Sequence, residues 1–229
     1  SFIGEDGFAS VAVNGSQTIV GESDNTITGY KLSEGTKSQN YIITTKNGKL
    51  KVTNRDAKYE IEVKANSATA TYDGKEHEAK GVETYEFTVN GQKYTVSGLT
   101  TEDPKQKDAG TYTNNLSGTP VVKDAKGNDV TAQFKVKTKN GSLVINKAEV
   151  TLKSADLSKE YDGTALVNGN TALEKESGFA EGEGATYTFT GSQTLVGSSS
   201  NAFSYALNSN TKPDNYNISK SEGTLTVTN

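Results

Sequence analysis

The chain has 229 residues, of which 32% are hydrophobic, and it contains no Trp, Met or Cys. So little apolar material favours several small cores over one thick core, and the lack of cysteine excludes disulfides and thiol chemistry. The 24 basic and 28 acidic residues are mixed along the chain and leave a net charge of −4, so no basic patch indicates nucleic-acid binding. No apolar run approaches the length of a membrane span.

The first predicted elements lie in residues 1–54, which nearly repeat the end of the chain. "GSQTIVGESDN" at 15–25 matches "GSQTLVGSSSN" at 191–201, and the whole segment aligns with residues 177–229. The stretches "NYIITT", "KNG" and "KLKVT" predict a strand, a turn and a strand, in the manner of a hairpin. We interpret this segment as a partial repeat unit, the back half of a unit.

Residues 55–147 form a second, more diverged unit. "YEFTVNGQKYTVSG" alternates large apolar and polar side chains around Asn90-Gly91, which predicts a hairpin with a type I′ turn. "FKVKTKNGSLVIN" at 134–146 matches the endings of the other two segments and predicts the same strand, turn and strand. The middle of the chain therefore repeats the same plan.

Residues 148–229 form the third unit, which ends on "YNISK", "SEG" and "TLTVT". No window has a sustained helical stripe of apolar residues, so each unit is predicted to be a small all-β domain of about seven short strands. An immunoglobulin-like sandwich is favoured, and a β-grasp-like sheet is the alternative. The joins near 54–55 and 147–148 are short and lack Gly and Pro, so we expect tandem units in an elongated rod.

A Tyr-Asp-Gly element occurs once in each of the two complete units. Turn chemistry accounts for all three residue types, as a buried tyrosine, an aspartate that caps the turn, and a glycine at positive φ. We therefore predict structural turns, and neither catalysis nor metal binding, at six residues: Tyr72, Asp73, Gly74, Tyr161, Asp162 and Gly163.

The sequence contains no set of residues that indicates an enzyme. His77 is the only histidine, and Leu166 stands at the matching position of the next unit, which excludes a histidine-based nucleophilic site shared by the repeats. Acidic turns such as "GEDG" and "DAKGNDV" lack the alternating oxygen ligands of a calcium loop. We predict no catalytic residues, no metal and no cofactor.

Two further hypotheses stay open at the level of sequence. Sugar platforms usually stack a ring on Trp or an exposed Tyr; the chain has no Trp, and its 11 Tyr lie mostly at strand positions, so glycan binding is less favoured and its residues are unknown. A Lys–Asn cross-link between strands would need Lys147 or Lys153 beside Asn229. Ordinary surface side chains are the favoured interpretation of all three.

The motifs "YDG", "KDAGTYTN", "GSQTLVGSSSN" and "NYNISKSEGTLTVT" resemble the MBG-type repeats of large Gram-positive cell-surface and adhesin-like proteins. The resemblance covers nearly the whole chain and is most specific in residues 148–229. It implies tandem extracellular β-domains on the bacterial cell surface, within a larger secreted, wall-attached protein.

The resemblance implies no particular ligand, and the repeats share only turn and core residues, which favours a spacer over a repeated binding site. The expected function is that of non-enzymatic stalk or spacer repeats, with neighbouring repeats of the same chain as partners. The alternative is a ligand-binding adhesin module that recognises host mucin, a matrix protein or a glycan. Neither a nucleic-acid partner nor membrane insertion of this fragment is expected.

Residues 1–54 are expected to be the weakest part of the chain. They match only the back of a unit, and a sheet without its opening strands exposes backbone donors and acceptors at an edge. A segment of this length also buries little surface. We expect it to fold as a trimmed domain with higher mobility than its C-terminal counterpart; the alternative is that its open edge pairs with a second copy of the chain.

Overall fold

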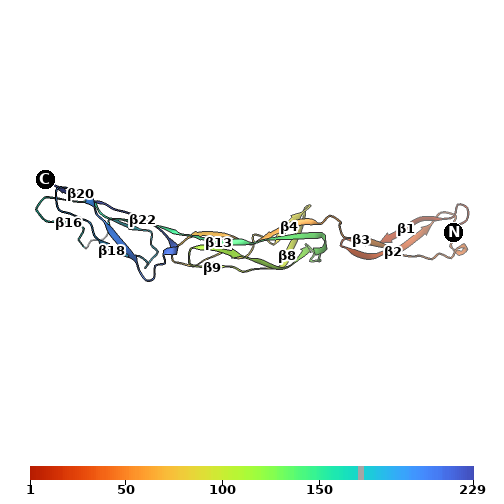
Figure 1. Ribbon diagram of the computed structural model, residues 1–229. Coiled ribbons are helices and arrows are strands. Elements are labelled where there is room, and N and C mark those ends of the chain that lie inside the picture. The colour runs from red at the N-terminus through yellow and green to blue at the C-terminus, as the bar shows by residue number, and fades with distance from the viewer. Residues whose placement is uncertain (170–172) are drawn as a thin grey trace. The chain divides into compact units, whose positions relative to one another are not determined.

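The structure is a computed structural model that describes residues 1–169 and 173–229. It is an all-β protein of several small sheets, in which strands account for 54% of the residues and helix for 4%. The ribbon consists of strands, connecting loops and single turns of 3-10 helix (Figure 1). The chain divides into two compact units: unit 1 comprises Ser1–Val63, Thr84–Leu99 and Gly118–Lys137, and unit 2 comprises Lys64–Glu83, Thr100–Ser117 and Thr138–Asn229.

Unit 1 begins with an antiparallel sheet in the order β1-β2-β3. Its strands are β1 (Phe8–Asn14), β2 (Gly21–Leu32) and β3 (Gly48–Val52), and the 3-10 turn η1 (Ser38–Asn40) precedes β3. The first half of β2 pairs with β3 and its second half pairs with β1. No residue from 1 to 54 is buried, so this sheet has no closed core of its own.

The remainder of unit 1 comes from the middle segment, residues 55–147. One sheet has the order β11-β8-β7, a second pairs β12 with β4, and the 3-10 turn η2 precedes β12. The bounds are β4 (Tyr59–Lys64), β7 (Glu86–Val89), β8 (Gln92–Thr101), β11 (Leu116–Asp124), η2 (Thr131–Gln133) and β12 (Phe134–Lys139). Both β8 and β11 also contribute residues to unit 2.

The hairpin predicted around Asn90-Gly91 is confirmed. Strands β7 and β8 pair antiparallel, and Val89 lies opposite Gln92. The two turn residues have φ of 49° and 75°, as a type I′ turn requires at both central positions. Local sequence alone was sufficient here, because only these two residues need to adopt positive φ.

Unit 2 holds the remaining strands of the middle segment and all those described in the C-terminal segment, residues 148–229. The middle segment supplies β5 (Ala68–Thr71), β6 (His77–Glu78), β9 (Lys105–Gln106), β10 (Gly110–Asn114) and β13 (Gly141–Asn146). The C-terminal segment supplies β14 (Ala148–Lys153), β15 (Leu157–Glu160), β16 (Leu166–Val167), β17 (Lys175–Ser177), β18 (Ala185–Phe189), β19 (Ser192–Gln193), β20 (Gly197–Ser200), β21 (Phe203–Leu207), η3 (Pro213–Asn215), β22 (Tyr216–Ser221) and β23 (Thr224–Thr228).

The sheets of unit 2 combine antiparallel and parallel pairs. The middle segment gives sheets β10-β13-β5 and β6-β9, and the C-terminal segment gives β17-β14-β22, β15-β23-β20, β16-β19 and β18-β21. The opening strand of the C-terminal segment changes sheets, because β14 pairs in parallel with β22 and the following β15 pairs in parallel with β23.

The hairpins predicted at the unit endings are wrong, although most of their strands are present. Strands β22 and β23 lie in different sheets, and so do β12 and β13. A Cβ at Gly223 would lie 2.6 Å from the Ser154 carbonyl oxygen, and one at Gly141 would lie 2.6 Å from the Ala65 carbonyl oxygen. These glycines therefore let two backbones approach closely where a strand passes between sheets.

The first strand predicted in the N-terminal ending does not form. Residues 41–47 have no strand, whereas the matching β22 is six residues long. β22 is held by β14 along its whole length, and the N-terminal segment has no strand in the position of β14. Without a backbone partner, the alternating pattern of "NYIITT" is not sufficient to make a strand.

One cluster of buried hydrophobic side chains lies in unit 2 and is continuous across Lys147–Ala148, with partly buried rings of both segments packed against it. Unit 1 has further buried side chains, among them Val63 and Val122. The cluster consists of Tyr72, Ala79, Leu143, Ile145, Ala148, Val150, Leu152, Leu173, Phe203 and Tyr216. Because both segments contribute, burying this cluster stabilises each of them and also holds them together.

Candidate functional site

The two Tyr-Asp-Gly turns have the same backbone geometry. Gly74 has a φ of 79° and Gly163 a φ of 80°. In each turn the aspartate, Asp73 or Asp162, accepts a 2.9 Å hydrogen bond from the backbone N–H two residues later. These contacts are those of a turn capped by its own carboxylate.

The two tyrosines of these turns differ in burial. Tyr72 is 4% exposed, whereas Tyr161 is 52% exposed, so the expectation of a buried ring is wrong for Tyr161. The Tyr72 hydroxyl donates a 2.5 Å hydrogen bond to Glu183 Oε1, and its ring meets Tyr216 edge-on at 5.3 Å between centroids. Tyr72 is thus buried by residues of the next segment.

These contacts belong to a junction in unit 2, made by two sets of residues. The upstream set comes from the middle segment and the downstream set from the C-terminal segment. The upstream set is Tyr72, Asp108 and Ala109, and the downstream set is Phe179, Glu183, Lys212, Asn215 and Tyr216.

The aromatic half of the junction is centred on the Glu183 carboxylate. Tyr72 donates to one of its oxygens and Tyr216 donates to the other at 2.8 Å. Burial raises the pKa of the Tyr216 hydroxyl to about 12, and the Glu183 carboxylate also raises it. Burial, followed by the bond to Glu183, raises the pKa of Tyr72 as well. At neutral pH both hydroxyls are therefore protonated hydrogen-bond donors and poor nucleophiles.

The polar half of the junction is centred on Asn215, which is 1% exposed. Its Oδ1 accepts a 2.8 Å hydrogen bond from the Ala109 backbone N–H, and its Nδ2 donates to Asp108 Oδ1 at 3.0 Å. Lys212 Nζ lies 2.6 Å from the other Asp108 oxygen. The hydrogen bonds from Lys212 and then Asn215 lower the pKa of Asp108, so this contact is charge-assisted.

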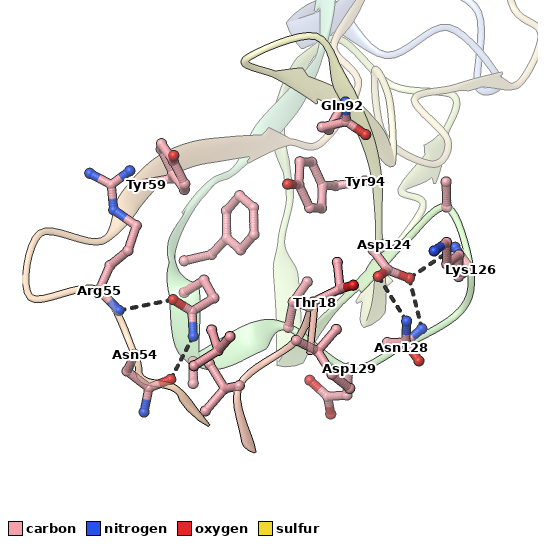
Figure 2. A pocket seen from close by; sticks show the side chains of 18 of the residues that line it. Thr18, Asn54, Arg55, Tyr59, Gln92, Tyr94, Asp124, Lys126, Asn128 and Asp129 are labelled. Atoms are coloured by element: carbon pink, nitrogen blue, oxygen red, sulfur yellow. Dashed lines mark hydrogen bonds between the residues drawn. The ribbon is translucent and has the colours of Figure 1, made fainter. Parts of the chain in front are cut away.

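A cleft of about 1020 Å³ lies in unit 1, lined by parts of residues 16–20, 52–59, 92–94 and 124–134. Figure 2 shows Tyr94 near the centre of this cleft, with Tyr59, Arg55 and Asn54 on one side and Asp124 and Asn128 on the other. Concave features of this kind are where small ligands usually bind.

The wall of the cleft is aromatic. The Phe134 ring lies 4.8 Å from the Tyr94 ring and 5.6 Å from the Tyr59 ring, centroid to centroid. The Arg55 guanidinium stacks on Tyr59 at 3.9 Å from the ring centroid. Aromatic faces and a planar cation can receive a sugar ring or a peptide side chain.

Hydrogen bonds hold the rim of the cleft in place. The Arg55 backbone N–H donates to Gln133 Oε1 at 3.0 Å, and Gln133 Nε2 donates to Asn54 Oδ1 at 2.5 Å (Figure 2). On the opposite side, the side-chain and backbone donors of Asn128 lower the pKa of Asp124. The groups on the rim are thus occupied with holding the loop and do not form an acid–base pair.

The other side chains considered at the level of sequence have ordinary partners. His77 Nε2 lies 2.9 Å from Asp73 Oδ1, and Lys153 Nζ lies 2.7 Å from a Glu174 carboxylate oxygen. Across residues 1–169 and 173–229, no three His, Asp or Glu side chains are placed to hold a metal ion. No arrangement of nucleophile and base is visible in these contacts.

Sequence reasoning missed a buried asparagine that closes the repeated motif. Asn114 and Asn201 are both 0% exposed. Asn201 Nδ2 donates to the Ala155 carbonyl at 2.9 Å, and Asn114 Nδ2 donates to the Asn66 carbonyl at 3.1 Å. Each bond holds the opening strand of its segment where that strand changes sheets. Its recurrence as the last residue of "GSQTLVGSSSN" and "KDAGTYTN" was the available signal.

Comparison of the chain with family models, with curated proteins and with solved structures finds no match. In the described part of the chain, no helix has the length and apolarity needed to cross a membrane. The class that the fold defines is therefore an all-β protein of small sheets, with an inter-segment junction in unit 2 and an aromatic cleft in unit 1.

Proposed function

We propose that the chain consists of non-enzymatic structural repeats, which serve as a stalk or spacer in an extracellular, adhesin-like protein of the bacterial cell surface. The observation that supports this function is the junction, where the Glu183 carboxylate accepts hydrogen bonds from both Tyr72 and Tyr216. The buried Tyr72, Asn215 and Tyr216 thus use their polar groups to hold the middle segment to the C-terminal segment. A spacer needs such joints, because bending at each join would shorten its reach.

The finer architecture is part of the same proposal. Each complete repeat is an immunoglobulin-like sandwich, and the repeats follow one another in an elongated rod. The change of sheet between β14 and β15 supports the sandwich, because one opening strand then serves both layers. The core that is continuous across Lys147–Ala148 supports a stiff join.

Small-angle scattering of the wild-type chain tests the rod. Three repeats of roughly 30–40 Å in single file would span about 100 Å from end to end. A compact globule with the same number of residues would instead have a radius of gyration of about 17 Å. Tyr72→Ala should loosen the joint and broaden the distance distribution. Tyr161→Ala is the matched control, because the same residue type in the same turn is exposed there. A compact wild-type profile would contradict the spacer function.

A ligand-binding adhesin module is the second candidate, and the aromatic cleft is the observation that favours it. Tyr59, Tyr94 and Phe134 form a wall of rings beside the stacked Arg55 guanidinium. An array of glycans, mucins and matrix proteins tests this function. Binding that Tyr94→Ala abolishes and Tyr205→Ala leaves unchanged would establish the cleft as the site, because Tyr205 is an exposed ring outside the cleft.

A further inference from the structure

The N-terminal segment carries a second downstream set. Each residue type of the junction recurs in it at the matching place, with aspartate in place of glutamate. The set is Phe2, Asp6, Lys37, Asn40 and Tyr41, whose contacts place them in the positions of Phe179, Glu183, Lys212, Asn215 and Tyr216. For Phe2 and Asp6 this structural match lies one residue away from the ungapped sequence alignment, which sets Ser1 opposite Ser177.

The contacts inside the two downstream sets agree closely. In the N-terminal set, the Tyr41 hydroxyl donates to Asp6 Oδ2 at 2.6 Å and accepts from the Ile3 N–H at 3.2 Å. The Phe2 ring meets Tyr41 edge-on at 4.8 Å between centroids. The bond to Asp6 raises the pKa of Tyr41.

The downstream set of the junction has the same arrangement. The Tyr216 hydroxyl donates to Glu183 at 2.8 Å and accepts from the Ala180 N–H at 3.1 Å, and Phe179 meets the ring edge-on at 5.2 Å. The 3-10 turns that precede the two tyrosines also match: the N–H of their last residue donates to the backbone oxygen of the lysine before the turn, at 3.0 Å in the first set and 3.1 Å in the second.

The two sets differ only in what covers them. Tyr216 is 4% and Asn215 1% exposed under the upstream set, whereas Asn40 is exposed and Tyr41 is only half-buried. Ile3, beside the N-terminal set, is 78% exposed. The N-terminal set is therefore preformed and uncovered.

The C-terminal segment carries a second upstream set. "QTLVG" aligns with "QKDAG", which puts Leu195 and Val196 in the places of Asp108 and Ala109, and Tyr161 occupies the place of Tyr72. The supporting strands match, because β16 pairs with β19 as β6 pairs with β9. The three residues are 68%, 50% and 52% exposed, so this set is also uncovered.

We propose that the second upstream set docks onto the N-terminal downstream set of a second copy of the chain. The inference rests on the proposed function, since it uses the same contact between repeats. The Tyr161 hydroxyl would donate to the Asp6 carboxylate, and the Val196 N–H would donate to the Asn40 side-chain oxygen. A second copy is the occupant because the junction shows this chain's own residues filling such a face.

One position of this contact is mismatched. The junction has the Asp108–Lys212 ion pair, whereas docking of two copies would place Leu195 against Lys37. The contact between copies therefore lacks a charge-assisted hydrogen bond and is weaker than the junction inside one chain. Because the two surfaces are different, the association is heterologous, and each copy can bind one further copy through each of its two surfaces.

Sedimentation velocity over a concentration series tests the proposal. The wild-type chain should associate weakly. The double variant Leu195→Asp, Val196→Ala carries the residue types that the junction has at Asp108 and Ala109, and it should have a dissociation constant about five-fold lower. Adding Lys37→Glu to this double variant should reverse the gain. Tyr161→Ala should remove association without changing the melting temperature, because the ring is exposed.

Two results would overturn the proposal. One is a monomer at all concentrations for both the wild-type chain and the Leu195→Asp, Val196→Ala variant. The other is association that is indifferent to Tyr161→Ala and Lys37→Glu. Scattering at low concentration on the same samples tests the spacer function separately, because it measures the single chain, so failure of docking and failure of the spacer are distinguishable.

Discussion

The N-terminal and C-terminal segments have nearly the same sequence over about fifty residues, but they are packed differently. Tyr41 is only half-buried, while the matching residue of β22, Tyr216, is 4% exposed. Val13 of β1 is 60% exposed, while Phe189 of β18 also packs against the core. A repeated sequence therefore does not produce a repeated environment.

The difference between the two segments comes from β14. It pairs with β22 over six residues and contributes Val150 and Leu152 to the core. The N-terminal segment has no strand in that position, so its apolar side chains pack only against one another, as Phe2 does against Phe8 and Tyr41. Burial of apolar surface drives folding, and the same residues contribute far less stability where they stay in water.

The largest expected effect is a difference in stability between alanine variants of the two matching tyrosines. Tyr216→Ala should lower the free energy of unfolding of unit 2 by about 3 kcal/mol, because it empties a buried ring site. Tyr41→Ala should cost below about 1 kcal/mol, because its ring is only half-buried. Urea unfolding followed by circular dichroism measures both, with the exposed Tyr205→Ala as the control. Equal losses at the two positions would contradict the difference in packing.

Alkaline titration should also distinguish the junction from the N-terminal segment. The pKa of Tyr216 is about 12 in the folded chain, above its ordinary value of 10.0. The folded state holds this proton more tightly, so the stability is fully present below about pH 10 and is lost as the pH rises towards 12. The loss should be about 2 kcal/mol.

Unfolding measured between pH 8 and 12 tests this dependence on Tyr216. Tyr216→Phe should make the profile of unit 2 less steep, since the ring stays but one ionising group is gone; some dependence should remain, because burial also raises the pKa of Tyr72 and Tyr187. Tyr41→Phe is the matched control and should leave the profile of unit 2 unchanged, because Tyr41 lies in unit 1. A profile of Tyr216→Phe as steep as that of the wild-type chain would assign the transition to other groups.

Alanine variants of the two matching asparagines should show a smaller difference in stability. Asn201→Ala should destabilise unit 2 by about 1.5 kcal/mol, because the Ala155 carbonyl loses its donor in a buried site. Asn25→Ala should cost below about 0.5 kcal/mol, since Asn25 is only partly buried. Thermal unfolding of both variants measures the difference, and a loss for Asn25→Ala as large as that for Asn201→Ala would be inconsistent with it.

The smallest effect concerns the two Tyr-Asp-Gly turns. Alanine at Gly74 or Gly163 should cost about 1 kcal/mol from positive φ alone. Gly74→Ala should cost somewhat more, because its Cβ would lie 3.1 Å from the Ala180 Cβ. Gly29→Ala is the control, with open space and no positive φ. Melting temperatures that rank Gly163→Ala below Gly74→Ala would contradict the turn and junction geometry.

Part of the fold could be predicted from sequence because its causes are local. The β7–β8 hairpin follows from Asn90-Gly91, where two adjacent residues adopt the positive φ of a type I′ turn. The strands of β12, β13, β22 and β23 follow from alternation, but their pairing does not. Their partners lie far away in the chain, and Gly141 and Gly223 resemble turn residues although they serve close backbone approach.

The candidate site was less accessible to sequence reasoning than the fold. The sequence by itself determined the repeats, the all-β class and the backbone of both Tyr-Asp-Gly turns, since each depends on neighbouring residue types. Only the tertiary structure decided that Tyr72 is buried against Glu183 while Tyr161 is exposed. The reason is physical: φ is set within a few residues, whereas burial depends on which segment packs against the ring.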